Sequence, residues 1–171
     1  ARMLVGKAER DDPTCMVMSR SPLQSDHLPG RAVLGFLAGA SVFRRDAFLQ
    51  AGGYEPQLFI GGEEELLAFD LATRGWLLVY APQLIAHHYP SPQRDPVYRR
   101  KLLARNAIWV AWMRLPWRSA WKQTLRALYA ARRRNILLTT AVDVLRGLPW
   151  ALKNRHVIPL EVASMYRQIR H

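Results

Sequence analysis

Three adjacent carboxylates, Glu63-Glu64-Glu65, are the clearest candidates for acid–base chemistry in this sequence. They follow Gly61-Gly62 and precede an apolar run with helical spacing, so they lie where a loop becomes a helix. Crowded like charges are harder to ionise together, which is how a carboxylate becomes a general base near neutral pH. The structural alternative is that a helix dipole favours acids in its first turn, by up to about 1 kcal/mol each.

Two histidines, His87-His88, end a short apolar segment and are the candidate metal ligands. Adjacent residues of a strand point to opposite faces, so at most one of them would enter a given site while the other packs or meets solvent. A neutral imidazole together with carboxylates from another segment could hold Mn²⁺ or Mg²⁺. The sequence has no HExxH motif and no Cys/His cluster, so a structural zinc site is not supported.

Several common nucleotide and hydrolase motifs are absent from the sequence. There is no GxGxxG motif, so a dinucleotide-binding fold of the usual kind is not indicated, and no GxxxxGK[ST] motif, so a P-loop nucleotide site is not indicated either. There is also no GxSxG nucleophile elbow.

The second half of the chain interleaves cations with tryptophans. The cations recur every four residues at Arg114, Arg118, Lys122 and Arg126, around the tryptophans Trp109, Trp112, Trp117 and Trp121. Such a segment could lie on an anionic membrane, with aromatic rings at the interface and cations on phosphates. The structural alternative is that these side chains pack against the first half of the chain. Nucleic-acid binding is disfavoured, because no reader motif is present.

Charge is divided unevenly along the chain. Residues 1–91 hold 8 Lys/Arg and 10 Asp/Glu, whereas residues 92–171 hold 17 Lys/Arg and 3 Asp/Glu, so the whole excess of +12 lies in the second part. That part can approach polyanions such as lipid head groups, nucleic acid or a diphosphate substrate. A solvated surface on Arg-rich helices would have the same composition.

Length and composition indicate a globular chain. Half of the 171 residues are apolar, which is enough for a sizeable core and too much for a disordered chain. No apolar run is long enough to span a bilayer, and the single Cys15 cannot form an internal disulfide. We therefore expect a cytoplasmic location, and the cation- and Trp-bearing segment adds the alternative of a peripheral position at the inner face of the membrane.

The predicted elements alternate in the first half and are helical in the second. We expect a short strand at most and a long loop in residues 1–31, and a buried strand or turn at 33–43. A short helix should end at Gly52-Gly53, and a helix of about three turns should run from the acids to Gly75. Strands are predicted at 76–81 and 84–89, and helices at 95–113, 117–133, 135–147 and 158–170.

Taken in order, these residues resemble the C-terminal half of the catalytic domain of family 2 glycosyltransferases, which have the GT-A fold. The resemblance runs from about Gly35 to Asn106. It rests on Gly39-Ala40, Arg44-Arg45 with Phe48, Gly52-Gly53-Tyr54-Glu55, Glu63-Glu64, Gly75-Trp76, Pro82, His87-His88 and Arg105-Asn106.

The resemblance implies transfer of a sugar from a nucleotide-sugar donor to an acceptor hydroxyl, on a saccharide or a lipid-linked acceptor. It assigns the base to Glu64, with Glu63 beside it. It assigns metal binding to His88, whose spacing matches slightly better than that of His87. The pairs Gly39-Ala40 and Arg105-Asn106 are assigned to substrate binding.

Two departures from the family pattern shape this expectation. The base is Glu where Asp is more usual, which changes its reach by about one methylene. The DxD motif of the donor-binding half is missing, so we expect the chain to be the acceptor-side portion, as a truncated gene product or a partial sequence. The divalent metal, Mn or Mg, is then expected only together with the donor half.

The predicted fold class is α/β: a partial, GT-A-like mixed sheet with helices, followed by a C-terminal helical region. Residues 1–92 would form the acceptor-side part of the catalytic domain, and residues 93–171 a basic, Trp-rich helical region that packs on it. The alternative function is a non-catalytic basic module that binds anionic membrane or nucleic acid. That module would be indifferent to Glu64→Gln and His88→Ala.

Overall fold

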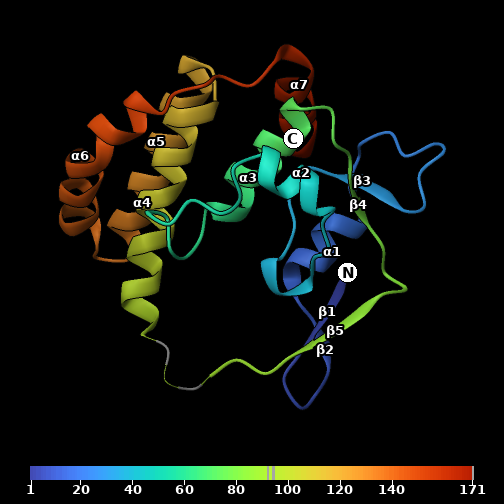
Figure 1. Ribbon diagram of the computed structural model, residues 1–171. Coiled ribbons are helices and arrows are strands. Elements are labelled where there is room, and N and C mark those ends of the chain that lie inside the picture. Colours follow the sequence, from blue (N-terminus) through green and yellow to red (C-terminus); the bar gives the residue numbers. More distant parts are fainter. Residues whose placement is uncertain (92, 94, 171) are drawn as a thin grey trace. The chain divides into compact units, whose positions relative to one another are not determined.

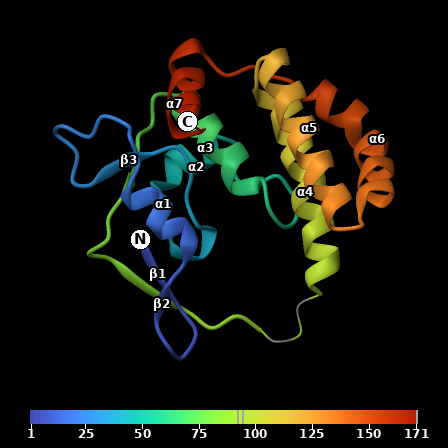
Figure 2. The same ribbon diagram turned by 180° about the vertical axis from the view of Figure 1, so that it is seen from behind.

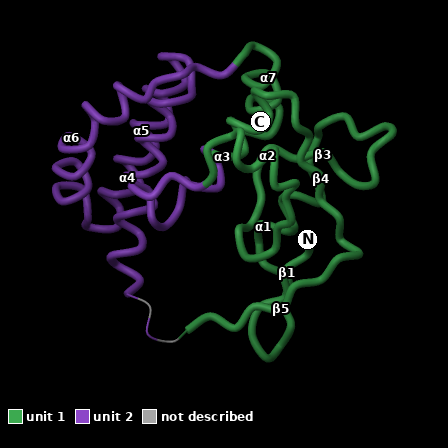
Figure 3. The backbone as a smooth tube through the Cα atoms, viewed as in Figure 1, with its two compact units in different colours: residues 1–53, 67–92, 159–171 green, residues 54–66, 93–158 purple. Residues whose placement is uncertain are grey.

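The computed structural model describes residues 1–91, 93 and 95–170, and the chain divides into two compact units (Figure 3). Unit 1 comprises residues 1–53, 67–92 and 159–171, and unit 2 comprises residues 54–66 and 93–158. The domain boundary predicted between residues 92 and 93 falls at residue 92, which lies outside the described residues. The division into 1–92 and 93–171 stays a prediction.

Unit 1 contains a small three-stranded mixed sheet in the order β2-β1-β5 (Figure 1). The central strand β1 (Arg2–Val5) pairs antiparallel with β2 (Arg10–Asp11) and parallel with β5 (Ile85–His88). The register sets Leu4 opposite His87 and Val5 opposite His88. The histidine segment is therefore tied to the first strand of the chain.

A second sheet of unit 1 has two antiparallel strands, β3 (Arg31–Val33) and β4 (Leu78–Tyr80). The apolar segment predicted as strand or turn at 33–43 is mostly turn: beyond Val33 it contains only the 3₁₀ helix η1 (Ala38–Ala40). The strand predicted at 76–81 is confirmed in its central part.

The helices of unit 1 include one that the sequence analysis missed. Helix α1 (Pro13–Ser19) begins with Asp12, whose side chain accepts a hydrogen bond from Thr14 N at 2.8 Å. The expectation of a loop here was wrong, because Asp12-Pro13 is a helix start, with a capping carboxylate followed by proline at the first helical position. Cys15 and Met18 then bury one face of this single short helix.

The other helices of unit 1 follow the prediction. Helix α2 (Arg45–Gln50) ends before Gly52-Gly53, and α3 (Glu63–Thr73) starts with the three acids and ends before Gly75. Helix α7 (Leu160–Arg170) closes the chain. The division between the units falls inside α3, after Leu66.

Two apolar clusters form the core of unit 1. One joins β1, α1, β3 and β4 through Met3, Cys15, Met18, Val33, Ala40 and Tyr80. The other joins α2 to α3 through Ala47, Ala51, Leu67 and Leu71, with Phe36, Phe43, Phe48 and Trp76 at its margin.

Unit 2 is built around three helices, α4 (Pro96–Arg114), α5 (Trp117–Arg133) and α6 (Leu137–Lys153). Both α5 and α6 pack on α4, and they also contact each other (Figures 1 and 2). Helix α4 is therefore the inner helix, with a nearly continuous run of buried residues from Ile108 to Met113.

Helix α6 does not end where the sequence analysis placed its end, at residue 147. It continues through Gly147 and Pro149 to Lys153. At Gly147 the indole of Trp109 occupies the space that a Cβ would need, and Trp109 Nε1 donates to Val144 O at 3.1 Å. Gly147 thus permits a close helix crossing rather than breaking the helix, and the prediction of a break was wrong.

The described residues confirm a mixed α/β chain, with small sheets in unit 1 and helices in both units. Among them, no helix is both long enough and apolar enough to cross a membrane.

Candidate active site

The acidic first turn of α3 follows a loop, residues 54–62, that is fastened to α4 within unit 2. The anchor is Asn106, which is fully buried and donates through Nδ2 to three carbonyl oxygens. These are Leu58 O at 2.6 Å, Ile60 O at 3.0 Å and Gly61 O at 2.6 Å. An amide group 45 residues or more along the chain therefore fixes the approach to the carboxylates.

Two glycines let this loop lie against α4. Gly61 and Gly62 have φ of +80° and +93°, a region that disfavours residues with a Cβ. A Cβ on Gly61 would collide with Leu103, and one on Gly62 would lie 3.1 Å from the Cβ of Asn106. The close contact between backbone and helix explains both glycines.

Arg105 supports Asn106 from the neighbouring position. Its Nε donates to Asn106 Oδ1 at 2.9 Å and its Nη2 donates to Gln57 O at 3.3 Å. The guanidinium also lies 4.2 Å from the centroid of the Trp109 ring. Burial lowers the pKa of Arg105 from its ordinary value. The Arg105-Asn106 pair thus holds the loop, and direct contact of either residue with a substrate stays a prediction.

The three carboxylates at the start of α3 are half-buried. The helix begins here with a bond from Leu66 N to Gly62 O at 2.8 Å. In the part of the chain that the structure describes, Glu63 Oε2 is buried without a hydrogen-bond partner. Buried acceptors of this kind are rare, because an unmade hydrogen bond costs about 1 to 3 kcal/mol. A bound group with an O–H or N–H donor would relieve this cost.

Tyr54 belongs to the same site. Burial raises the pKa of its phenol, and the charges of Glu64 and then Glu63 raise it further. The phenol therefore lies within electrostatic reach of both carboxylates. In the sequence, Tyr54 is only one member of the Gly-Gly-Tyr-Glu pattern, and its position at the start of the loop that leads to the acids is the signal that points to this site.

The two histidines lie on β5 in unit 1 and alternate as predicted. His87 is exposed, and its Nδ1 lies 3.2 Å from Glu9 Oε1, whereas His88 is half-buried. His87 and His88 therefore face opposite sides of the strand.

The described residues do not complete a metal site. Among them, no group of three or more His, Cys, Asp or Glu side chains is placed to hold an ion. His87 and Glu9 lie close enough together to offer two ligands. The remaining positions of an octahedral ion such as Mg²⁺ would have to be filled by substrate and water. A role for His88 or His87 in metal binding stays a prediction.

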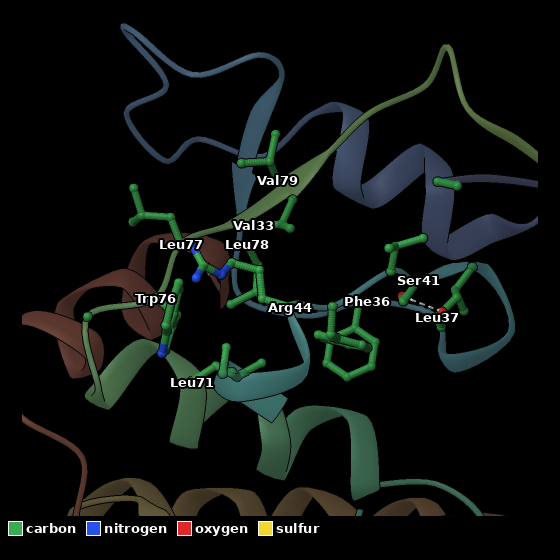
Figure 4. A pocket seen from close by; sticks show the side chains of 15 residues that line it. Val33, Phe36, Leu37, Ser41, Arg44, Leu71, Trp76, Leu77, Leu78 and Val79 are labelled. Carbon is green, nitrogen blue, oxygen red and sulfur yellow. Dashed lines mark hydrogen bonds between the residues drawn. The ribbon is translucent and has the colours of Figure 1, made fainter. Parts of the chain in front are cut away.

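A pocket of about 520 Å³ lies elsewhere in unit 1, between η1, α2 and β4 (Figure 4). Phe36, Leu71 and Trp76 form apolar walls, and Arg44 lies 5.2 Å from the Trp76 ring centroid. Leu37 and Ser41, on either side of η1, also line it. Aromatic faces beside a guanidinium could hold a flat or ring-shaped polar ligand.

The predicted substrate residues Gly39 and Ala40 lie in η1, next to this pocket. Ala40 is buried, whereas Gly39 is exposed. Neither residue lines the pocket, and their contact with a substrate stays a prediction.

Within unit 2 the structure brings together part of the predicted site. Glu63, Glu64 and the Arg105-Asn106 pair lie in unit 2 and share one loop. The predicted metal ligands His87 and His88 and the predicted substrate residues Gly39 and Ala40 lie in unit 1.

Comparison with known proteins finds similarity to a protein of Mycobacterium tuberculosis, in strains CDC 1551 and H37Rv. The matching protein is an N-acetylglucosaminyl-diphospho-decaprenol L-rhamnosyltransferase, and it is 31% identical over 116 residues. The similarity supports a relationship to the glycosyltransferases.

The match is partial in both directions. It covers 61% of this chain, and the chain spans 36% of the length of the rhamnosyltransferase. No family model matches the chain, and no solved structure matches it significantly.

Proposed function

We propose that this chain is the acceptor-side part of a glycosyltransferase of the family 2, GT-A type. It would act in transfer of a sugar from a nucleotide-sugar donor to a hydroxyl of a lipid-linked saccharide. The similarity to a rhamnosyltransferase with a diphospho-decaprenol acceptor supports glycosyl transfer and this acceptor class. The observation that carries the proposal is the pair of half-buried carboxylates, Glu63 and Glu64, at a loop that Asn106 holds in place.

In this proposal Glu64 is the general base. Its carboxylate takes the proton of the acceptor hydroxyl as that oxygen bonds to the anomeric carbon of the donor sugar, and the nucleoside diphosphate leaves with the electron pair of the broken bond. The unpartnered Glu63 Oε2 would accept a hydrogen bond from the acceptor. Tyr54, which the charges of both carboxylates reach, would donate its phenolic hydrogen bond at the same place.

Arg105 and Asn106 are positioning residues in this scheme. They touch the loop backbone, and through it they fix where α3 starts and where its first-turn carboxylates lie. Displacing a catalytic group by about 1 Å can reduce turnover on the order of 100-fold, so the loop anchor matters for rate as well as for stability.

A divalent metal would neutralise charge on the diphosphate leaving group, and His88 or His87 is the proposed ligand on this chain. Because the described residues do not form a complete ion site, no step of the proposed mechanism depends on the metal.

The test compares three adjacent substitutions in the longest form of the protein that its gene encodes. Glu64→Gln should lower kcat by roughly 10²- to 10⁴-fold while donor binding is nearly retained, because it removes the base and keeps the shape. Glu63→Gln should mainly raise the KM for the acceptor. Glu65→Gln, in the same helical turn, is the matched control and should change neither constant substantially.

The readout is transfer from a panel of nucleotide-sugars to polyprenyl-diphospho-N-acetylglucosamine. Retained turnover in Glu64→Gln would remove its assignment as base. If all three variants and the unchanged protein lack activity but bind anionic surfaces equally well, the alternative of a non-catalytic basic module is supported instead.

A further inference from the structure

Helix α5 carries a partly exposed apolar ridge, two of whose tryptophans, Trp117 and Trp121, also pack edge-on against Trp112 of α4. Trp117, Trp121, Leu125 and Tyr129 follow one another at intervals of four residues, which places them along one side of the helix. The side chains of Trp121 and Leu125 are 56% and 65% exposed. The buried residues of α5, Ala120, Thr124 and Ala131, lie on the adjoining side of the helix.

A basic ridge runs beside the apolar ridge. Arg118, Lys122 and Arg126 are also four residues apart, each one position after an apolar residue, and all three are exposed. Helix α5 therefore has apolar side chains and cations next to each other on its exposed surface.

Helix α6 has an exposed apolar stripe of its own. Leu138, Val142, Leu145 and Leu152 recur at spacings of four, three and seven, which keeps them on one face of a helix. Leu138 is 81% exposed and Leu145 is 67% exposed. The buried residues of α6, among them Thr140 and Val144, lie on other faces.

These features form one surface, which we call the α5–α6 surface. It consists of the apolar residues Trp121, Leu125, Tyr129, Leu138, Leu145 and Leu152 and the cations among residues 117–153. Both helices pack on α4 and contact each other within unit 2 (Figure 2).

The surface is strongly basic. Residues 117–153 include eight Lys/Arg, all exposed, and one acid. That acid, Asp143, is paired with Lys101 on α4 at 2.8 Å and does not offset the exposed cations. The apolar residues are thus surrounded by charge of a single sign.

We propose that the α5–α6 surface docks on an anionic lipid bilayer, with both helices in the plane of the interface. Exposed leucines and aromatic rings would enter the acyl boundary, and the flanking cations would bind lipid phosphates. This combination fits a bilayer better than the other partners for such a surface. A second copy would set two arrays of like charge face to face, and a nucleic acid would leave the leucines of α6 without an apolar partner.

The first test is co-sedimentation of the full chain with vesicles of phosphatidylcholine, with and without phosphatidylglycerol. The unchanged protein should bind the anionic vesicles, and its binding should weaken as salt is added. Leu138→Ser with Leu145→Ser should weaken binding roughly tenfold or more, because two apolar side chains no longer enter the bilayer. The matched control is Val17→Ser with Leu49→Ser, two exposed helical residues of unit 1, which should leave binding unchanged.

The second test removes charge. Arg118→Gln, Lys122→Gln and Arg126→Gln together should weaken binding on the order of 100-fold, since each cation near an anionic surface contributes about a factor of five to ten. Lys7→Gln, Arg20→Gln and Arg45→Gln remove the same charge from exposed positions of unit 1 and should have much smaller effects. Equal losses in the two triple variants would contradict a local docking surface.

Insertion can be followed directly with a polarity-sensitive fluorophore on Leu138→Cys. The native Cys15 is buried, so the new thiol is the accessible one in the described residues. Emission should rise and shift to the blue with anionic vesicles, and it should not change for a label on Val17→Cys. Two results would overturn the proposal. One is a dimer in sedimentation that is lost in Leu138→Ser with Leu145→Ser, which would indicate a second copy as the partner. The other is oligonucleotide binding that this double variant leaves unchanged, which would indicate a nucleic acid.

This inference does not rest on the proposed catalysis. Vesicle binding is measured without donor or acceptor, and Glu64→Gln should bind vesicles like the unchanged protein. Loss of transfer activity and loss of docking are therefore separate results.

Discussion

At the scale of single residues, Asn106 is the side chain on which the candidate site depends most. Its amide joins α4 to three carbonyls of the loop before α3, and its oxygen accepts from Arg105. All of these partners lie in unit 2. A buried amide that serves several backbone groups at once has no close substitute among the other side chains.

Asn106→Ala should lower the free energy of unfolding by about 2 to 4 kcal/mol, because Ile60 O and Gly61 O lose their Asn106 donor, whereas Leu58 O still accepts from Ile60 N at 2.7 Å. Urea denaturation followed by circular dichroism measures this change. Asn154→Ala is the control: that exposed side chain donates only to Trp150 O among the bonds seen, and its loss should cost less than about 1 kcal/mol. Similar costs for both variants would contradict the anchoring role of Asn106.

Tyr54 gives a titration test of the acidic site. Its pKa is raised above the ordinary value of about 10 by burial and by the charges of Glu64 and Glu63. Glu64→Gln should therefore lower the pKa of Tyr54, while Glu65→Gln should leave it closer to that of the unchanged protein. Tyrosinate absorbance measures the shift, and Tyr54→Phe identifies the signal. An unchanged pKa in Glu64→Gln would separate Tyr54 from the carboxylates.

The same shift sets the sign of a stability change at high pH. Because the folded-state pKa of Tyr54 is raised, the stability linked to its proton is fully present below the unfolded pKa of about 10 and is lost as pH rises through the folded pKa. Tyr80 has a pKa raised mainly by burial and contributes in the same direction. The urea midpoint of unfolding should therefore fall between about pH 9 and 11, where tyrosine titrates. In Tyr54→Phe this fall should be smaller, because the phenol that loses its proton is absent.

At the scale of elements, the crossing of α4 and α6 depends on a glycine. Gly147→Ala would usually stabilise an exposed helix by about 1 kcal/mol. Here it should instead destabilise the protein by about 1 to 3 kcal/mol, because the indole of Trp109 fills that space.

Thermal unfolding measures this effect, and two variants test its cause. Combining Gly147→Ala with Trp109→Phe should cost less than the sum of the single changes, since the smaller ring makes room. Gly35→Ala is the control, because a Cβ there meets no atom within 4 Å. Stabilisation by Gly147→Ala would show that the crossing is looser than the structure indicates.

At the scale of the whole molecule, unit 1 is assembled from three separate parts of the chain. The last part supplies α7, where Tyr166 packs edge-on against the fully buried Phe69 of α3 with ring centroids 5.5 Å apart. Val162 and Ala163 of α7 are buried as well. Helix α7 therefore covers the part of α3 that contains Phe69.

Truncation after Ile158 should therefore expose Phe69 and speed amide hydrogen exchange in the second half of α3. Hydrogen exchange with mass spectrometry follows this segment. Tyr166→Ala should give the same change in smaller degree, while Leu160→Ala, at an exposed position of the same helix, should leave α3 protected. Unchanged exchange after truncation would contradict the role of α7.

The amino-acid sequence by itself determined the features that depend on neighbours along the chain. The helix 117–133, the acids at the start of α3, and the alternation of His87 and His88 follow from helical spacing, capping and the two-residue period of a strand. The helix at Pro13–Ser19 was also encoded locally, in Asp12-Pro13, and was missed because the same residues are common in turns. The similarity to a rhamnosyltransferase supports the predicted relationship, whereas the GT-A fold and the site roles stay predictions.

The tertiary structure alone decided the features that depend on partners far along the chain. Asn106 binds carbonyls 45 to 48 residues away, so no local pattern could distinguish a loop anchor from a substrate contact. Gly147 resembles a helix end until Trp109 is seen against it. Likewise, the periodicity of α5 and α6 predicts apolar faces, but only packing on α4 shows which apolar residues are buried and which stay exposed. Burial is a property of the assembled fold, and the sequence period fixes only the direction in which a side chain points.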